Sequence, residues 1–246
     1  MYKKDNYKIL SNTQLTRRSW LMVLEGDTRY LTAPGQFVNV AVDGKFLRRP
    51  ISLCDYDAHT ITLLYDTVGE GTEWMSHRKP GEYLDLLTGL GNGFDISECG
   101  ASPVLLGGGV GVAPLLKLAK TLIVKGKKPI AVLGFNSAAD VVLEAELKAA
   151  GVETYVSTVD GTYGTKGFVS DVIREKNLTP DYFFACGPLP MLRSLCGLDI
   201  PGQLSLDERM ACGFGVCMCC SLETASGAKR ICKDGPVFRK EELIWK

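Results

Sequence analysis

Five of the nine cysteines of this chain lie in one short segment, and this clustering constrains the fold and chemistry more than any other feature. They are Cys212, Cys217, Cys219, Cys220 and Cys232, and four of them form the pattern C-x4-C-x2-C-x11-C. Its first part, C-x4-C-x2-C, is the spacing of the plant-type [2Fe–2S] loop, in which four thiolates hold two irons. The spacing predicts Cys212, Cys217, Cys220 and Cys232 as the ligands of such a cluster.

Cys219 is the surplus thiol, because choosing it as third ligand would shorten the second spacing to one residue and leave Cys220 unused. Gly213 and Gly215 allow the backbone to fold closely around a cluster and to direct N–H groups at its sulfides.

Structural zinc is the alternative occupant, since it also takes four thiolates. Zinc sites usually consist of two short C-x2-C pairs, whereas the first two cysteines here are five positions apart, so the pattern favours iron–sulfur.

Composition and charge limit the classes of partner. An odd, clustered set of cysteines argues against a secreted disulfide framework and indicates a reducing, cytoplasmic location. The 28 Lys and Arg balance the 28 Asp and Glu, which gives no support for a nucleic-acid partner. The start of the chain leads into no long apolar core, and the most apolar helical stretch, residues 115–124, carries two lysines and is too short for a bilayer. Neither a signal peptide nor a membrane partner is expected.

Turn signals and hydrophobic periodicity divide the 246 residues into three parts. Short β-rich runs, among them residues 20–24, 37–42 and 60–65, predict a small antiparallel barrel of about six strands with a helix starting near Thr72. After Pro103, strands alternate with helices, which predicts a parallel sheet covered by helices on both faces. The expected strands are 104–106, 130–133, 154–157 and 182–185, and the expected helices are 115–123, 138–150, 168–175 and 189–195. From Pro201 the alternation stops, so the predicted boundaries are 1–98, 99–200 and 201–246.

A glycine-rich turn follows the first strand of the predicted parallel sheet. Its glycines let the main chain approach a pyrophosphate, and the next helix begins with an N-terminus that favours anions. The turn departs from G-x-G-x-x-G, and a tight connection without a ligand is the alternative. Residues 134–137 after the second strand offer neither an acid for a ribose nor an arginine for a 2′-phosphate, which favours NAD over NADP. The candidate residues in this turn are Gly107, Gly108, Gly109 and Gly111. Cys186, Gly187 and Pro188 follow the last apolar strand. They would lie beside the same ligand, or they form a turn with a buried cysteine.

Two segments of the predicted barrel could hold a phosphate-bearing cofactor. Residues 48–52, Arg-Arg-Pro-Ile-Ser, offer a guanidinium and a hydroxyl in extended backbone, which suits a phosphate and a ring edge. Residues 69–72, Gly-Glu-Gly-Thr, open a helix and offer a second anion site. A solvated strand end and a capped helix are the alternatives. His59 and His77 are isolated, and no paired carboxylates or Ser/His/Asp arrangement is present, so no catalytic acid or base is predicted.

In this order, the motifs resemble the ferredoxin reductase superfamily and, more narrowly, the electron-transfer subunits of dihydroorotate dehydrogenase B. The most specific segments are 48–52, 163–167, 208–212 and 231–238. The resemblance implies NAD on the α/β domain, the cluster on the four cysteines, and FAD on the barrel. The FAD contacts would fall on Arg49, Pro50, Ile51, Ser52, Leu64, Tyr65, Asp66, Gly71 and Thr72. Two residues depart from the pattern: Ile51 stands where the wider superfamily has an aromatic residue, and Asp66 stands where the family usually carries arginine.

The resemblance also implies a function in pyrimidine biosynthesis. A separate FMN-containing catalytic subunit would oxidise dihydroorotate, and electrons would pass through the cluster and FAD of this chain to NAD⁺. The assembly would be a heterotetramer with two copies of each subunit. The alternatives are a related FAD/[2Fe–2S] subunit of a hydrogenase or of an NAD(P)H:ferredoxin oxidoreductase, and a non-enzymatic module with a zinc-binding tail.

Overall fold

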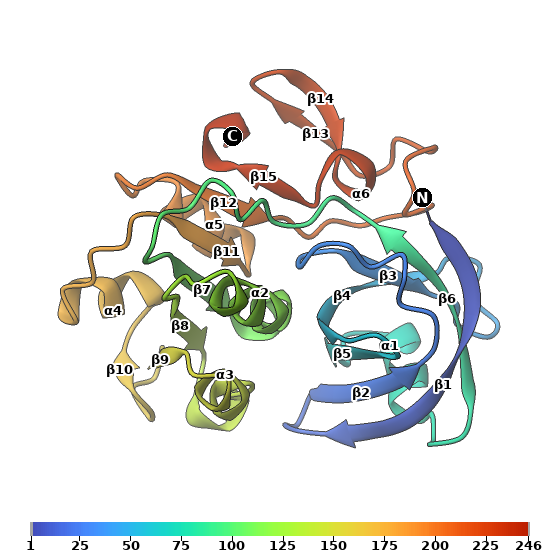
Figure 1. Cartoon of the computed structure of the whole chain (residues 1–246). Coiled ribbons are helices and arrows are strands. Elements are labelled where there is room, and N and C mark those ends of the chain that lie inside the picture. Colours follow the sequence, from blue (N-terminus) through green and yellow to red (C-terminus); the bar gives the residue numbers. More distant parts are fainter. Residues whose placement is uncertain (1, 246) are drawn as a thin grey trace.

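The computed structural model describes residues 2–245 and contains a barrel, a separate sheet with helices on both faces, and a cysteine-rich segment beside both (Figure 1). The predicted antiparallel barrel is confirmed: six strands close in the order β1-β2-β5-β4-β3-β6. Along β6, every second side chain points inward, so that Leu84 and Leu86 join the barrel core. The barrel elements are β1 (Lys3–Gln14), β2 (Ser19–Glu25), β3 (Phe37–Val40), β4 (Arg49–Tyr56), β5 (Thr60–Asp66), α1 (Glu70–Ser76) and β6 (Tyr83–Leu90).

The second sheet has seven strands in the order β10-β9-β8-β7-β11-β12-β15, all parallel except the last. The central strands β7 and β11 are buried along their whole length because helices cover both faces. The strands are β7 (Val104–Gly108), β8 (Ile130–Phe135), β9 (Glu153–Thr158), β10 (Thr165–Lys166), β11 (Phe183–Cys186), β12 (Gly202–Ser205) and β15 (Val237–Arg239). The helices are α2 (Ala113–Val124) and α3 (Glu144–Ala149) on one face, with α4 (Val169–Glu175) and α5 (Leu189–Leu195) on the other.

Two expectations about secondary structure are wrong. The single helix expected over 138–150 is interrupted: a 3₁₀ turn ends at Asp140, whose carboxylate accepts the N–H and hydroxyl of Ser137 at 3.1 and 2.8 Å. Leu143 then adopts φ 63° with its side chain buried, and α3 starts only at Glu144. The sheet also does not stop at Pro201, because β12 and β15 extend it. The predicted domain boundaries remain predictions.

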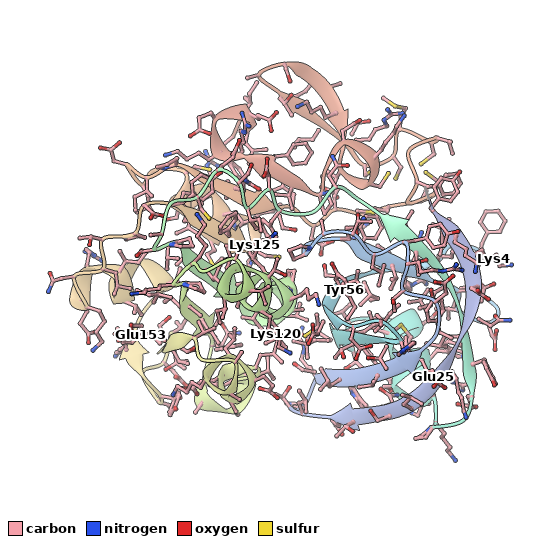
Figure 2. All side chains as sticks on the ribbon, viewed as in Figure 1. Lys4, Glu25, Tyr56, Lys120, Lys125 and Glu153 are labelled. Carbon is pink, nitrogen blue, oxygen red and sulfur yellow. The ribbon has the colours of Figure 1, made fainter. Side chains whose placement is uncertain are left out.

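Polar and apolar contacts join the barrel to the sheet. Lys117 of α2 donates to the carbonyl of Tyr56 at 2.5 Å, and Lys120 pairs with Asp55 at 2.5 Å. Figure 2 labels Tyr56 on the barrel and Lys120 on the neighbouring helix α2. Phe94, in the segment after the barrel, packs edge-on against Phe184 of β11 with ring centroids 5.5 Å apart. These contacts hold the end of β4 beside α2 and so fix the barrel relative to the sheet that α2 covers.

The cysteine-rich segment consists of a loop, the hairpin of β13 (Ser221–Thr224) and β14 (Gly227–Arg230), and the short helix α6 (Ile231–Asp234). Its buried Cys220 and Cys232 share an apolar core with Phe37 of the barrel and Phe238 of β15. Asn92, which follows β6, donates its side-chain amide to the carbonyl of Asp234 at 2.9 Å. The segment is therefore packed against both larger parts. No helix within residues 2–245 has the length and apolar character needed to cross a bilayer.

Phe184→Ala is expected to lower the free energy of unfolding by about 3–5 kcal/mol, because it removes a fully buried ring from the contact with Phe94. Urea unfolding monitored by circular dichroism measures the change. Phe46→Ala is the matched control, since Phe46 is fully exposed, and its effect should stay within about 0.5 kcal/mol. Equal losses in both variants would contradict the assigned packing.

Candidate functional site

A cavity of about 1090 Å³ lies between the barrel and the carboxyl ends of the parallel strands. It opens beside β7, which lies between β8 and β11 in the sheet. The strand order changes direction at this point, and ligands of such sheets usually bind there. Its volume slightly exceeds the roughly 300–1,000 Å³ typical of single-ligand pockets. The cavity brings together fourteen of the predicted site residues: Arg49, Pro50, Ile51, Ser52, Leu64, Tyr65, Asp66, Thr72, Gly108, Gly109, Gly111, Cys186, Gly187 and Pro188.

Two predicted site residues, Gly71 and Gly107, are not part of this lining. A Cβ at Gly71 would collide with the guanidinium of Arg49. A Cβ at Gly107 would lie 2.7 Å from Val112 and 2.9 Å from Leu115. Both glycines therefore make room for neighbouring side chains, and Gly71 leaves the space in which Arg49 lies.

The adjacent arginines of the barrel have different partners. Arg48 pairs with Asp85 of β6 at 2.8 Å and donates to the carbonyl of Asn39 at 3.2 Å. Arg49 lines the cavity, and its guanidinium donates to the carbonyl of Leu47 at 2.5 Å. Because Asp85 already neutralises Arg48, Arg49 is the arginine of this pair that can bind a phosphate. This basic group and Ser52 line the same cavity, and together they fit the diphosphate and ring edge of a flavin dinucleotide.

Gly111 allows the two strand-end turns of the sheet to pack closely. A Cβ at this position would lie 2.6 Å from both the Cys186 carbonyl oxygen and the Gly187 Cα. Cys186 is buried, and burial raises the pKa of its thiol to about 12. The thiol is therefore neutral at physiological pH and offers a small, uncharged surface at the cavity wall.

Several cavity residues were not predicted from the sequence. Arg18 follows β1, Asp140 ends the 3₁₀ turn after β8, and Phe168 precedes α4. Asp207, Glu208 and Arg209 also line the cavity. These last three residues follow the carboxyl end of β12, so recognising 202–205 as a strand would have identified them as cavity residues. No local signal in the sequence marks Arg18.

The cysteines of the clustered segment are arranged in two pairs. The thiols of Cys212 and Cys217 lie near each other, as do those of Cys220 and Cys232. The N–H of Val216 donates to the Cys212 sulfur at 3.4 Å, and the N–H of Cys232 donates to the Cys220 sulfur at 3.4 Å. Two thiol pairs that accept backbone N–H groups fit a binuclear cluster with two thiolates on each iron. Within residues 2–245, no three His, Cys, Asp or Glu side chains surround a single metal position.

The electrostatics of the loop favour a thiolate at Cys212. Burial raises the pKa of this thiol, but hydrogen bonds from the N–H groups of Phe214, Val216 and Cys217 outweigh that effect and bring the pKa to about 6. Metal ligation by cysteine requires this deprotonated form. The backbone N–H groups of the loop thus stabilise a negatively charged sulfur at Cys212.

The two candidates for the third ligand lie in different environments. Cys220 is buried within reach of Cys232, whereas Cys219 is exposed and its thiol lies 3.6 Å from the carbonyl oxygen of Arg209. These surroundings fit Cys220 better than Cys219 as the ligand, and the assignment stays a prediction.

Asn39 connects the cysteine loop to the barrel. It is almost fully buried on β3, opposite Pro50 of β4, and its side-chain amide donates to the carbonyl of Cys212 at 3.2 Å. Gly213 has φ +75°, and a Cβ there would collide with the Asn39 amide. One buried side chain thus links the strand beside the main cavity with the loop that carries the first cysteine.

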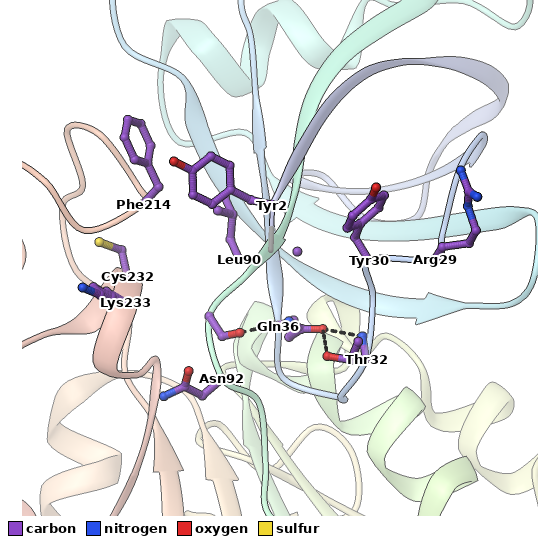
Figure 3. Close-up of a pocket in the computed structure, with 12 residues that line it drawn as sticks. Tyr2, Arg29, Tyr30, Thr32, Gln36, Leu90, Asn92, Phe214, Cys232 and Lys233 are labelled. Atoms are coloured by element: carbon purple, nitrogen blue, oxygen red, sulfur yellow. Dashed lines mark hydrogen bonds between the residues drawn. The ribbon is translucent and has the colours of Figure 1, made fainter.

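A second, smaller cavity of about 620 Å³ lies beside the cysteine-rich segment (Figure 3). Tyr2 and Phe214 border it with ring centroids 5.6 Å apart, and Cys232 and Lys233 lie nearby on α6. Gln36 fixes the opposite wall by accepting the N–H of Thr32 at 2.7 Å and donating to the Gly91 carbonyl at 2.9 Å. The second cysteine pair therefore lies beside a hollow in the surface.

Two family models match the chain. Residues 207–244 match the iron–sulfur cluster binding domain of dihydroorotate dehydrogenase B, and residues 105–197 match the oxidoreductase NAD-binding domain. Among curated proteins, the chain is 45% identical over 254 residues to the electron transfer subunit of dihydroorotate dehydrogenase B (NAD⁺) from Bacillus velezensis, covering 98% of this chain and 99% of the relative. The subunit of the same name from Geobacillus sp. strain WCH70 is 43% identical, covering 99% and 100%.

Solved structures show the same architecture. A chain of the NADH-dependent reduced ferredoxin-NADP oxidoreductase, described for flavin-based electron bifurcation, aligns with a TM-score of 0.88 and 28% identity. The alignment covers 97% of this chain and 90% of that chain. The ferredoxin reductase in carbazole 1,9a-dioxygenase aligns with a TM-score of 0.70 and 21% identity over 81% of this chain and 67% of that one, which shows a shared fold.

Cys220→Ser is expected to abolish stable iron binding, whereas Cys219→Ser should retain the iron content of the unaltered protein. The reason is that Cys220 lies against Cys232, while Cys219 points to the Arg209 carbonyl. Iron analysis and visible absorption of anaerobically purified protein measure the effect. Loss of iron in the Cys219 variant with retention in the Cys220 variant would reverse the ligand assignment.

Gly111→Ala is expected to reduce kcat/KM for NADH by about 10- to 100-fold, because its Cβ would push the Cys186–Gly187 turn out of position. NADH-dependent reduction of ferricyanide provides the assay. Gly126→Ala is the control for backbone strain alone, since Gly126 lies past α2 outside the cavity lining, and its φ of +75° disfavours a side chain although the added Cβ has open space. An unchanged Gly111 variant would show that the close approach of these turns has no part in nucleotide binding.

Proposed function

The chain belongs to the family of dihydroorotate dehydrogenase B electron transfer subunits, and on this premise we propose that it accepts electrons from an FMN-containing catalytic subunit that oxidises dihydroorotate. The family expected from the motifs is confirmed by relatives that cover almost the whole chain. The protein is an NAD-linked flavin and iron–sulfur oxidoreductase subunit that transfers electrons to NAD⁺. The matches also support the expected cofactors, FAD, a [2Fe–2S] cluster and NAD.

The observation that carries the proposal is the convergence of the barrel motif and the nucleotide-domain turns on one cavity. Arg49 would bind the FAD diphosphate and Ser52 the flavin ring edge, with Pro50, Ile51, Leu64, Tyr65, Asp66 and Thr72 as further contacts and Gly71 as the space for Arg49. Gly108, Gly109, Gly111, Gly187 and Pro188 would bind NAD through their main chain, with Gly107 packing beneath them and the neutral Cys186 thiol closing the wall. When bound, FAD exchanges an electron pair with NAD and single electrons with the cluster.

The position of the cysteine segment supports electron entry from a partner. Cys217 is exposed, and its neighbours Val216 and Met218 are 70% and 53% exposed. Single electrons cross only short distances, so a partner must approach a cluster closely, and apolar side chains around one ligand suit such a docking face. We place the catalytic subunit on this face, in a heterotetramer with two copies of each subunit in the cytoplasm.

A second candidate is an electron-transfer subunit of a ferredoxin oxidoreductase, supported by the structural match at 28% identity and TM-score 0.88. The curated dihydroorotate relatives are more similar in sequence, at 45% and 43% identity, and therefore favour the first proposal.

The test combines cofactor analysis with reconstitution. Anaerobically purified chain should show flavin bands over an iron–sulfur background, with about two irons per chain and no stoichiometric zinc. Dihydroorotate-dependent formation of NADH should require both this chain and the FMN subunit from the same source. A colourless zinc protein would refute the proposal. NADH formation driven by reduced ferredoxin, without any by the catalytic subunit, would favour the second candidate.

A further inference from the structure

The barrel side of the main cavity carries an ion pair between Asp66 and Arg18, and Arg18 has no role in the proposed function. Among the described barrel residues that line the cavity, the cations are Arg18 and Arg49, and the carboxylate is Asp66. A guanidinium nitrogen of Arg18 lies 3.3 Å from one carboxylate oxygen of Asp66. A bare carboxylate would repel the diphosphate of a dinucleotide, so the state of this pair affects cofactor binding directly.

The turn between β1 and β2 holds the backbone of Arg18 in place. The hydroxyl of Thr16 accepts the N–H groups of Arg18 at 3.2 Å and Ser19 at 2.9 Å. The carbonyl of Arg18 accepts the N–H of Thr67 at 2.9 Å and its hydroxyl at 3.3 Å. Contacts from its own turn and from the end of β5 therefore set where the Arg18 side chain begins.

The carboxylate of Asp66 is engaged on both oxygens. Ser19 stands opposite Asp66 in the pairing of β2 with β5, and its hydroxyl donates to Oδ1 at 2.7 Å while Arg18 occupies Oδ2. The Asp66 side chain is 18% exposed and that of Arg18 is 61% exposed. Within residues 2–245, the Arg18 guanidinium donates a hydrogen bond to the Asp66 side chain and to no other side chain.

A guanidinium has five N–H donors, and Asp66 engages one of its nitrogens. The remaining donors lie at the cavity rim on an exposed, positively charged group, where they can bind a phosphate as a planar fork. We propose that Arg18 is a second phosphate-binding residue of the FAD site, beside Arg49, and that Asp66 is a positioning residue which holds it there. This inference rests on the proposed FAD site.

The decisive comparison is between Asp66→Asn and the double variant R18A/D66N, because both lack the carboxylate charge. Apo-protein is titrated with FAD, and quenching of flavin fluorescence gives the dissociation constant. Arg18→Ala in the D66N background should weaken FAD binding roughly 10- to 100-fold, as expected for lost hydrogen bonds to a charged group. Riboflavin, which has no phosphate, should bind both variants equally. Arg17→Ala is the matched control, since Arg17 is an exposed neighbour of the same charge outside the cavity lining.

The sign of the D66N effect tests the role of Asp66. A positioning residue predicts that D66N weakens FAD binding about two- to fivefold, although it removes a negative charge. Tighter FAD binding by D66N would show that Asp66 only repels the phosphates, and equal FAD affinity of D66N and R18A/D66N would exclude a contact from Arg18. A parallel loss of riboflavin affinity would also overturn the phosphate contact. Failure of the unaltered chain to bind FAD would instead refute the FAD site itself.

Discussion

Phe37 of the barrel, Phe238 of the last sheet strand, and the buried Cys220 and Cys232 pack into one apolar core. This shared core holds the cysteine-rich segment against the two larger parts, and the proposed position of the cluster depends on it. Without it, the cysteine loop would be joined to the rest of the chain mainly through polar contacts such as the Asn39–Cys212 hydrogen bond. Burial of two candidate cluster ligands in a common core thus couples the geometry of the cluster site to the stability of the fold.

The pairing of charges then decides which basic groups can meet a cofactor. The chain has no net charge, so binding of an anionic dinucleotide depends on local arrangement. Asp85 of β6 neutralises Arg48, while the neighbouring Arg49 lines the cavity. Asp66 occupies one side of Arg18 and leaves its other donors at the rim. Arg48 and Arg49 therefore have different roles, because Asp85 engages the first and the second lines the cavity.

Much of the fold was predictable because its signals are local. Alternating β-rich runs predicted the barrel, and strands alternating with helices predicted the parallel sheet. The prediction was wrong where a local signal was absent or misleading. The strand 202–205 contains buried Gln203, whose amide donates to the carbonyl of Asp95 at 2.9 Å, and no apolar run marks it. In residues 138–150, helix-forming composition concealed the turn at Asp140, which depends on a side-chain contact with Ser137.

The sequence by itself indicated the chemistry that this protein can hold: the cysteine spacing favours two irons over one zinc, and the glycine turns leave main chain open to a nucleotide. These properties follow from residue type and short spacing, so they are readable without the fold. Only the tertiary structure decided which cysteines pair, that Asn39 joins the barrel to Cys212 across 173 positions, and that Arg18 meets Asp66 across 48. Those contacts depend on strand register and on packing between distant segments, which no local pattern in the chain encodes.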